Sequence, residues 1–458
     1  MSQSAILKLV ARGNDDYLID NNIELQFFNN IFPKSNNFSS DTISFYSSGN
    51  NNWGGNINFT IEKVGDLLKN IYLVLKLPEL SVSQISGQSD PITNERTSGY
   101  RVKWVDYIGN IIIENVKLKI GGQIISEYGG EYSQIYTELY DLVWSKLCLL
   151  GQNRNLITPS RNIGSQYIYI PLHFWFTENN LAHLPLISCQ YQEITLDIKL
   201  RDFDKCYHVL KKLSDEAGDE ILVYGHTNFT LTPQFFTNLR LDCKMIFLDS
   251  HVREELVKKK QEIVINQVQT YKSSINSNNK IRLNFNLPIK EMFFLLQSNT
   301  IKNYNELYNF SGKPKYVPVG IDNIDKDLWL NISETHLLEE ASLLMNNIPI
   351  IDKKDPIYYY YLQNYEYYKN KLDSNIYMIS FAVLPHEYAH TGSCNFSKID
   401  NIELEIKLSS AEQKFIHSSD NTKVVSIGPG ETNNIKVFAT NYNVLVIESG
   451  ISALLYSS

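Results

Sequence analysis

The feature that most constrains the fold of this chain is a strict alternation of apolar and polar residues in several short runs. The runs are IYLVLKLP from Ile71, VKLKIGG from Val116, ITLDIKL from Ile194 and IELEIKL from Ile402. Because successive side chains of a strand point to opposite faces, a period of two places each apolar set against a second sheet. The weighting towards 29 Tyr and 21 Phe, with only 5 Met, also favours strands over helices. The sequence therefore predicts a mainly β chain built of sandwiches.

One strand pattern occurs twice. ITLDIKL and IELEIKL share the pattern I-x-L-x-I-K-L at an offset of 208 (402 − 194). Two weaker matches follow in the same order: VKLKIGG with LWLNISE at 212 (330 − 118), and KNIYLVL with KEMFFLL at 221 (292 − 71). Chance similarity between short alternating strands is the alternative explanation. The preserved order favours two similar β domains joined near residue 250.

A single segment at that junction has helical periodicity. Asp249 or Ser250 can cap a helix that runs through Val252, Leu256 and Val257 and ends in basic residues. We predict a linker helix over residues 250–261. The domains are then an N-terminal arm at 1–22, a first domain at 23–249 and a second at 250–458.

Composition and charge exclude several classes of protein. The formal net charge is −8, which argues against a nucleic-acid-coating protein, because phosphate binding needs clustered Lys and Arg. Five scattered cysteines form no C-x-x-C pair and are interpreted as buried thiols in a reducing compartment. No secretory signal and no membrane-spanning run is recognised in the sequence. We expect a soluble protein that is made in the cytosol.

The strongest enzyme motif is HEYAH, in which His386, Glu387 and His390 match H-E-x-x-H. In zinc proteases this motif needs a helix, so that both histidines lie on one face and the glutamate acts as general base. Here Pro385 precedes the motif, and Thr391-Gly392-Ser393 follows as a turn. We therefore predict a short connection without a helix, and no metal or cofactor, while His386, Glu387 and His390 remain the candidate metal ligands.

Two further features concern the surface. N-x-[ST] motifs occur at six positions, of which Asn309 and Asn331 are the candidate glycosylation sites. The segments 299–327 and 346–372 break the period of two and are rich in Asn and Tyr. We predict that both are long outer loops, in which the tyrosines from Tyr358 to Tyr361 pack together.

Several blocks of the chain resemble the major capsid proteins of nucleocytoplasmic large DNA viruses. They are AILKLVARGNDDYLIDNNIELQFF, GDLLKNIYLVLKLP, IIIENVKLKIGGQII with EYGGEY, YIYIPLHFWF, LPLISCQYQEITLDI, MIFLDSHVREEL, LNFNLPIKEMFFLLQ, GSCNFSKIDNIEL and NYNVLVIESGISALLYSS. Together they cover most of the chain in the family's order. The segment before GSCNFS departs from the family pattern and contains HEYAH.

The resemblance implies an all-β fold of two tandem eight-stranded antiparallel jelly rolls, a structural role and no catalytic site. It implies a homotrimer that forms a pseudo-hexagonal capsomer, contacts neighbouring capsomers and tiles an icosahedral shell. Minor capsid and penton proteins are the other implied partners, with the arm at 1–22 on the inner face near them. Direct contact with nucleic acid is not expected, and an internal membrane is contacted only indirectly. The implied location is the virion capsid, with synthesis and assembly in the host cytoplasm.

Two other functions remain open from the residues alone. One is a zinc-dependent hydrolase that uses HEYAH, for which metal bound by purified protein and lost on His386→Ala would be evidence. The other is a carbohydrate-binding β-sandwich at an attachment surface, for which glycan binding without regular trimers would be evidence.

Overall fold

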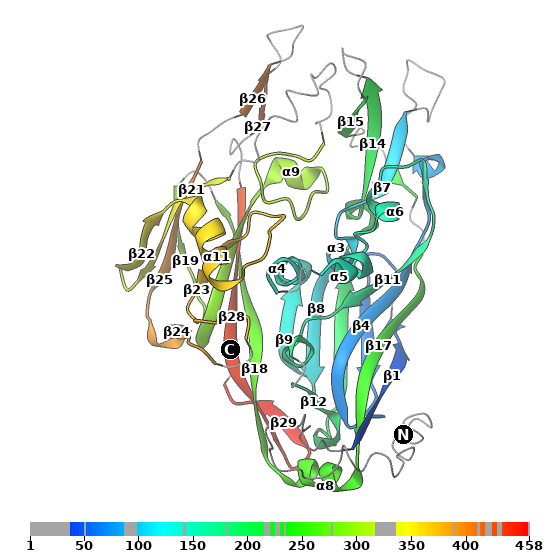
Figure 1. Ribbon diagram of the computed structural model, residues 1–458, viewed down its shortest axis with the longest axis vertical. Helices are drawn as coiled ribbons and strands as arrows, with labels where there is room; N and C mark the ends of the chain where they lie inside the picture. The colour runs from blue at the N-terminus through cyan, green and yellow to red at the C-terminus, as the bar shows by residue number, and fades with distance from the viewer. Residues whose placement is uncertain are drawn as a thin grey trace, which may run out of the picture.

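The computed structural model describes residues 37–49, 52–86, 99–140, 143–179, 182–214, 220–224, 230–232, 235–275, 278–316, 336–387, 390–409, 413–416, 424–427 and 433–456. Two β-sandwiches stand side by side and are joined at one end by helix α8 (Figure 1). The arm at 1–22, Asn331 and the LWLNISE segment lie outside the described residues.

The first sandwich consists of two antiparallel sheets that pack face to face. One sheet has the order β1 (Phe38–Tyr46), β17 (Thr237–Leu248), β4 (Leu67–Leu77) and β11 (Gln166–Pro171), and β12 (Leu184–Pro185) also pairs with β4. The other has the order β2 (Ser48–Gly49), β3 (Asn56–Ile61), β13 (Ile194–Leu200), β8 (Ile113–Ile120) and β9 (Gln123–Gly129). The alternating apolar residues of β4 and β13 are fully buried between the sheets, as the period of two predicts.

The second sandwich has a matching pair of sheets. One has the order β18 (Gln261–Ile275), β28 (Asn433–Glu448), β20 (Pro288–Ser298) and β23 (Tyr377–Ser380), with β24 (Cys394–Asn395) on β20 and β29 (Ile451–Leu454) on β28. The other has the order β19 (Asn278–Arg282), β25 (Ile402–Leu408), β21 (Leu338–Met345) and β22 (Ile348–Lys354).

Further short strands and helices complete the two sandwiches. The strands are β5 (Leu80–Ser81), β6 (Ile85–Ser86), β7 (Tyr100–Trp104), β10 (Asn162–Ile163), β14 (Tyr207–Ser214), β15 (Glu220–Tyr224), β16 (Thr230–Leu231), β26 (Gln413–Ile416) and β27 (Val424–Ile427). The helices of the first sandwich are η2 (Val82–Gln84), α3 (Ile108–Ile112), α4 (Gly130–Tyr140), α5 (Trp144–Leu149), α6 (Arg154–Ile157), α7 (Trp175–Glu178), η3 (Leu186–Ser188) and η4 (Phe203–Lys205). Those after the first sandwich are α8 (Ser250–Lys258), α9 (Asn299–Asn303), η5 (Tyr358–Leu362), α11 (Gln363–Tyr367) and η6 (Phe396–Lys398).

The internal repeat is confirmed at two of its three matches. β13 and β25 occupy the same place in their sheets, and so do β4 and β20. The match of VKLKIGG with LWLNISE is wrong, because the strand beside β25 that takes the place of β8 is β21. Both segments alternate, and alternation alone does not specify which strand pairs with which.

The linker helix begins where the sequence predicts. The Asp249 side chain accepts a hydrogen bond from the backbone nitrogen of Ser250, and the Arg253 guanidinium lies 3.0 Å from the buried Asp66 carboxylate. The predicted end at residue 261 is wrong, since Lys259 is extended and β18 begins at Gln261. No helix among the described residues is long and apolar enough to cross a membrane.

The prediction of a loop over residues 346–372 is wrong for most of that segment. Asn346 and Asn347 form a tight turn into β22, and the tyrosine cluster forms the helical segments η5 and α11. Most of β22 is exposed on both faces, so it has no alternating pattern by which it could be recognised. In the segment 299–327, α9 and an irregular stretch extend to Tyr316, and residues 317–327 lie outside the described residues.

Candidate functional site

The two sandwiches meet along a continuous apolar contact. Phe293 and Leu295 of β20 belong to the buried cluster of the first sandwich, whereas Met292 and Phe294 belong to the core of the second. β20 is therefore buried on both faces, which explains its unbroken apolar run MFFLL. We call this contact surface the junction.

Helix α4 lies in the junction and begins at a glycine without space for a side chain. A Cβ atom on Gly130 would lie 2.3 Å from the carbonyl oxygen of Asn110, 2.4 Å from that of Ile113 and 2.5 Å from the hydroxyl of Tyr308. The Tyr308 hydroxyl donates a hydrogen bond to the Asn110 carbonyl at 2.9 Å. Gly130 therefore permits the second sandwich to approach the backbone of the first.

A buried carboxylate connects α4 to the segment before β23. Glu138 is 0% exposed, and it accepts hydrogen bonds from the Ser374 hydroxyl at 2.7 Å and from the Gln134 amide at 2.7 Å. It also accepts hydrogen bonds from the backbone nitrogens of Asp373 and Ser374, at 3.1 and 3.0 Å. Burial raises the pKa of Glu138. The many donors compensate for part of the cost of removing this group from water.

Two more buried acids cross the junction. Glu131 of α4 lies 2.6 Å from the Lys436 ammonium of β28. Burial acts to raise the pKa of Glu131, but the charge and hydrogen bond of Lys436, together with the charges of Lys272 and Arg201, outweigh burial and hold the pKa at about 2. Glu291 of β20 accepts hydrogen bonds from the hydroxyls of Tyr140 and Tyr368. Burial, and then the Glu291 charge, raise the pKa of both tyrosines far above the usual range.

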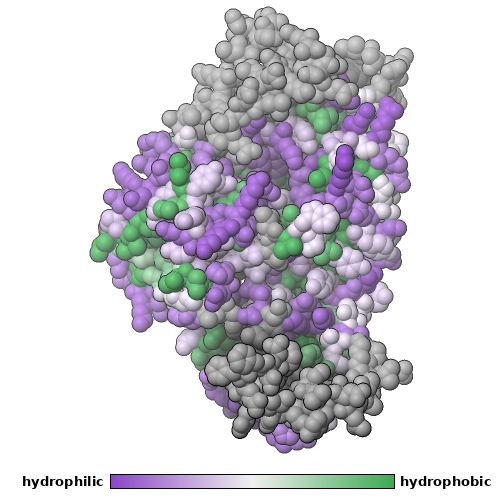
Figure 2. All heavy atoms as spheres, in the orientation of Figure 1, coloured by the Kyte–Doolittle hydropathy of each residue, from purple (hydrophilic) through white to green (hydrophobic). Residues whose placement is uncertain are grey.

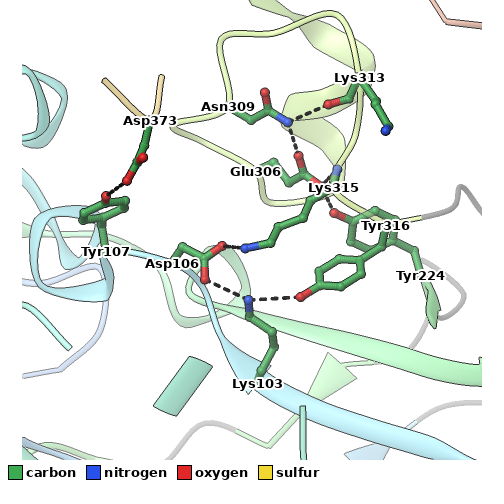
Figure 3. A network of polar contacts seen from close by, with 10 residues as sticks. All are labelled: Lys103, Asp106, Tyr107, Tyr224, Glu306, Asn309, Lys313, Lys315, Tyr316 and Asp373. Atoms are coloured by element: carbon green, nitrogen blue, oxygen red, sulfur yellow. Dashed lines mark hydrogen bonds and ion pairs between the residues drawn. The ribbon is translucent and has the colours of Figure 1, made fainter. Parts of the chain in front are cut away.

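Near α9, the junction carries a network of charged side chains (Figure 3). The ammonium groups of Lys103 and Lys315 contact the two different carboxylate oxygens of Asp106, and the Lys103 ammonium is 2.9 Å from its oxygen. Burial opposes ionisation of Asp106, but the two lysines hold its pKa at about 2. The hydroxyl of Tyr107 donates to Asp373 at 2.9 Å. The network therefore links charged and polar side chains of the first sandwich to those of the second.

Glu306 belongs to the same network and lines a cleft of about 410 Å³ between the sandwiches. Its carboxylate accepts hydrogen bonds from the Tyr224 hydroxyl, the Asn309 amide and the backbone nitrogen of Lys315. Burial raises the pKa of Glu306 to about 7.

The side chain of Asn309, a candidate glycosylation site, is held in place by several hydrogen bonds. Its side chain is half-buried, its amide nitrogen also donates to the Lys313 carbonyl at 2.8 Å, and its amide oxygen accepts from Ser311. Asn309 is therefore not well exposed, because the loop folds back onto Glu306. Glycosylation at Asn309 or Asn331 remains an untested prediction.

Two of the HEYAH residues lie in a turn after β23. His386 and Glu387 occupy that turn, as the sequence predicts, and residues 388–389 lie outside the described ones. His390 lies 3.1 Å from the Ser393 hydroxyl, and its ring centroid is 5.0 Å from that of Tyr442. In the part of the chain that the structure describes, no three His, Cys, Asp or Glu side chains gather as metal ligands.

All five cysteines are free thiols, and the prediction that they are buried holds for three of them. Cys189, Cys206 and Cys243 are buried, while Cys148 and Cys394 are half-buried. Burial raises the pKa of Cys189 to about 11 and also raises that of Cys206 and Cys243.

Sequence reasoning missed the residues of the junction. Two signals could have indicated them: the paired glycines of EYGGEY, and a glutamate directly before the apolar run of KEMFFLL. Neither signal specifies a partner, because the contacts join residues 150 or more positions apart.

Comparisons with known proteins all find similarity to viral major capsid proteins, and two family descriptions match successive parts of the chain. The family described as "Major capsid protein N-terminus" matches residues 26–249, and that described as "Large eukaryotic DNA virus major capsid protein" matches residues 253–453. The major capsid protein of Phaeocystis pouchetii virus is 24% identical, with 99% of each chain covered. That of Paramecium bursaria Chlorella virus 1 is 24% identical, with 98% of this chain and 99% of the relative covered.

Solved structures agree in fold. A chain of the PBCV-1 virus capsid has a TM-score of 0.72 at 22% identity and covers 94% of this chain and 100% of its own. The Faustovirus major capsid protein has a TM-score of 0.68 at 12% identity and covers 93% of each chain. The predicted all-β fold of two tandem jelly rolls is confirmed by this likeness and by the paired sheets of each sandwich.

Proposed function

The chain belongs to the family of large eukaryotic DNA virus major capsid proteins and is a structural component of the virion capsid, and we propose that three copies assemble into a pseudo-hexagonal capsomer. Such capsomers tile an icosahedral shell, and neighbouring capsomers are the main partners of each one. In this proposal the protein has a structural role in the shell and no catalytic role.

The observation that supports this proposal is the equivalence of the two sandwiches. Each contains a sheet whose main row of four strands ends in β11 or β23, with one or two short strands beside that row. This sheet is opposed by one that ends in the hairpin β8–β9 or β21–β22. Two similar units in one chain let a threefold assembly present six nearly equal sides, which is the symmetry of a hexagonal net. The apolar junction and its buried ion pairs hold the two units at one fixed angle.

Light scattering on the purified protein tests the proposal. We expect one species with three times the 52.8 kDa mass of a single chain. A stable single-chain mass at micromolar concentrations would contradict it.

The same proposal assigns the segment at 1–22 as an arm at the inner face of the shell, where minor capsid and penton proteins bind. Deletion of residues 1–22 is expected to leave the trimer mass unchanged and to prevent closed shells after synthesis in the host cytoplasm. Truncated protein that fails to fold would show that the segment belongs to a sandwich.

A non-enzymatic role also makes a prediction for the HEYAH segment. We expect purified protein to contain much less than one zinc ion per chain by elemental analysis, and His386→Ala to leave the metal content unchanged. Stoichiometric zinc that is lost in that variant would favour a hydrolase.

A further inference from the structure

One irregular segment of the second sandwich lies on the first sandwich. It consists of residues 304–316, directly after α9, and we call it the clasp segment. The Asn305 amide donates hydrogen bonds to the backbone carbonyls of Asp204 and Tyr207, at 2.6 and 3.1 Å. Residues of the segment, Glu306 among them, form one wall of the cleft between the sandwiches. The clasp segment therefore closes this cleft on one side.

Further contacts hold the clasp segment in place. The Lys315 ammonium contacts Asp106, and the Lys103 ammonium lies 3.2 Å from the Tyr316 hydroxyl (Figure 3). Phe310 belongs to the buried cluster of the first sandwich. Because release exposes this apolar side chain, the open form is a minor state at every pH. Figure 2 gives the hydropathy of the side chains on this face of the molecule.

Two ionisable groups of opposite type are buried where the clasp segment meets the first sandwich. Glu306 is 7% exposed, His208 of β14 is 5% exposed, and both line the cleft. Burial raises the pKa of Glu306 to about 7, although hydrogen bonds from Asn309 and Lys315 act the other way. Burial, and then the charge of Lys103, lower the pKa of His208 to about 3. Each group is therefore more easily accommodated here without its charge.

The other charged groups around these two are Lys103, Asp106, Lys313, Lys315 and Asp373, and the tyrosines nearby are Tyr107, Tyr224 and Tyr316. Lysine, aspartate and tyrosine side chains ordinarily titrate far from neutral pH. Burial opposes ionisation of Asp106, but Lys103 and Lys315 hold its pKa at about 2. The Lys313 ammonium points away from Glu306 (Figure 3). Glu138 accepts a hydrogen bond from the backbone of Asp373 and does not line the cleft.

We propose that the clasp segment is a pH-dependent closure of this cleft, bound to the first sandwich while Glu306 is protonated and His208 is neutral, and released more often when either group ionises. A charged group costs free energy when it is taken out of water, and release of the segment returns both groups to water. The inference does not depend on the proposed trimer, because both groups and the cleft belong to one chain.

The two groups respond to pH in opposite directions. The pKa of Glu306 in the closed form lies above the ordinary 4.5, so the closure that it favours is complete below pH 4.5 and is lost as the pH rises to about 7. The pKa of His208 lies below the ordinary 6.5, so its contribution is complete above pH 6.5 and is lost as the pH falls to about 3. Release is therefore rarest at about pH 5 to 6 and more frequent on both sides.

Two variants separate the groups. Glu306→Gln retains only the effect of His208, and we expect its equilibrium constant for opening to fall about 30-fold from pH 5 to pH 8. His208→Asn retains only the effect of Glu306, and its constant should rise about 70-fold over the same range. Glu62→Gln is the matched control, since Glu62 is an exposed acid after β3, and it should keep the wild-type profile.

Hydrogen exchange of backbone amides, corrected for the intrinsic rate at each pH, measures this constant even when the open form is rare. The amide of Lys315 donates to the Glu306 carboxyl and reports on the clasp segment. The amides of β13, between β3 and β8, report on global unfolding. The measurement uses the full chain in whichever oligomeric state it adopts.

The slopes decide the outcome. Opposite slopes in the two variants, with the clasp amides less protected than those of β13, support the inference. A flat or reversed slope in either folded variant overturns it, and so does exchange of the clasp and β13 amides together at every pH. If one variant does not fold, the slope of the other decides. None of these results affects the proposed trimer, whose test is the particle mass.

Discussion

At the scale of single residues, the junction depends on side chains whose role follows from what surrounds them. Gly130 is required because two backbone carbonyls and a tyrosine hydroxyl occupy the space of a side chain. Glu138, Glu131 and Glu291 are tolerated because each has a partner from the other sandwich: Ser374, Lys436 and Tyr140 respectively. Removal of one partner leaves a buried polar group unsatisfied, which costs more than the original bond contributed.

Gly130→Ala is expected to lower the free energy of unfolding by about 3 kcal/mol, because the new methyl group overlaps atoms that cannot move independently. Gly164→Ala is the matched control, since a Cβ atom at Gly164 meets nothing within 4 Å, and its effect should stay within about 0.5 kcal/mol. Urea unfolding of both variants measures the difference. Equal stabilities would show that the junction is looser than described.

Glu306 should make stability depend on pH. Its pKa in the folded protein is about 7 against 4.5 for the free group, so the folded state binds the proton more tightly. The stability that Glu306 contributes is therefore complete below pH 4.5 and is lost as the pH rises to about 7, by up to about 3 kcal/mol. Glu306→Gln should reduce the slope of unfolding free energy between pH 5 and 7. An unchanged slope in the variant would argue against this origin.

At the scale of elements, the period of two predicts the strands that have one face in a core and the other in solvent. β4, β13 and β25 are of this kind, and all three are found where the sequence places them. Alternation is absent where both faces of a strand are buried or both are exposed. β20 is buried on both faces, and most of β22 is exposed on both, so neither strand alternates. A period of two indicates a strand that packs against a core on one face only. β20 also packs on its second face, in the junction.

The candidate site was accessible to sequence reasoning only in part. The HEYAH turn follows from Pro385 and Gly392, which are local signals. The junction depends on which elements lie beside each other, and no local pattern encodes that arrangement. The repeat was the one long-range signal, and it identified two equivalent strand pairs.

The linker helix offers a comparison of two ion pairs on one element. Arg253 pairs with Asp66, which is 5% exposed, whereas Lys258 and Glu254 are both more than 70% exposed. We expect Arg253→Ala to cost about 1 kcal/mol and Lys258→Ala about 0.3 kcal/mol, because solvent screens the exposed pair. Thermal unfolding measures both. A larger effect of Lys258→Ala would contradict the account of the helix.

At the scale of the whole molecule, one buried cluster extends from the first sandwich into the second. Interfaces between independent domains are usually smaller and more polar. We therefore expect the two sandwiches to unfold together, as one calorimetric transition, at neutral pH. Two separate transitions would show that the junction does not hold the sandwiches as a rigid unit.

The central claim is that two equivalent sandwiches in one rigid chain build a threefold particle with six similar sides. Electron microscopy of the purified protein, with class averages viewed along the symmetry axis, tests it most directly. We predict a closed ring of six lobes with threefold symmetry. Particles with two lobes, or rings with any other symmetry, would contradict the account.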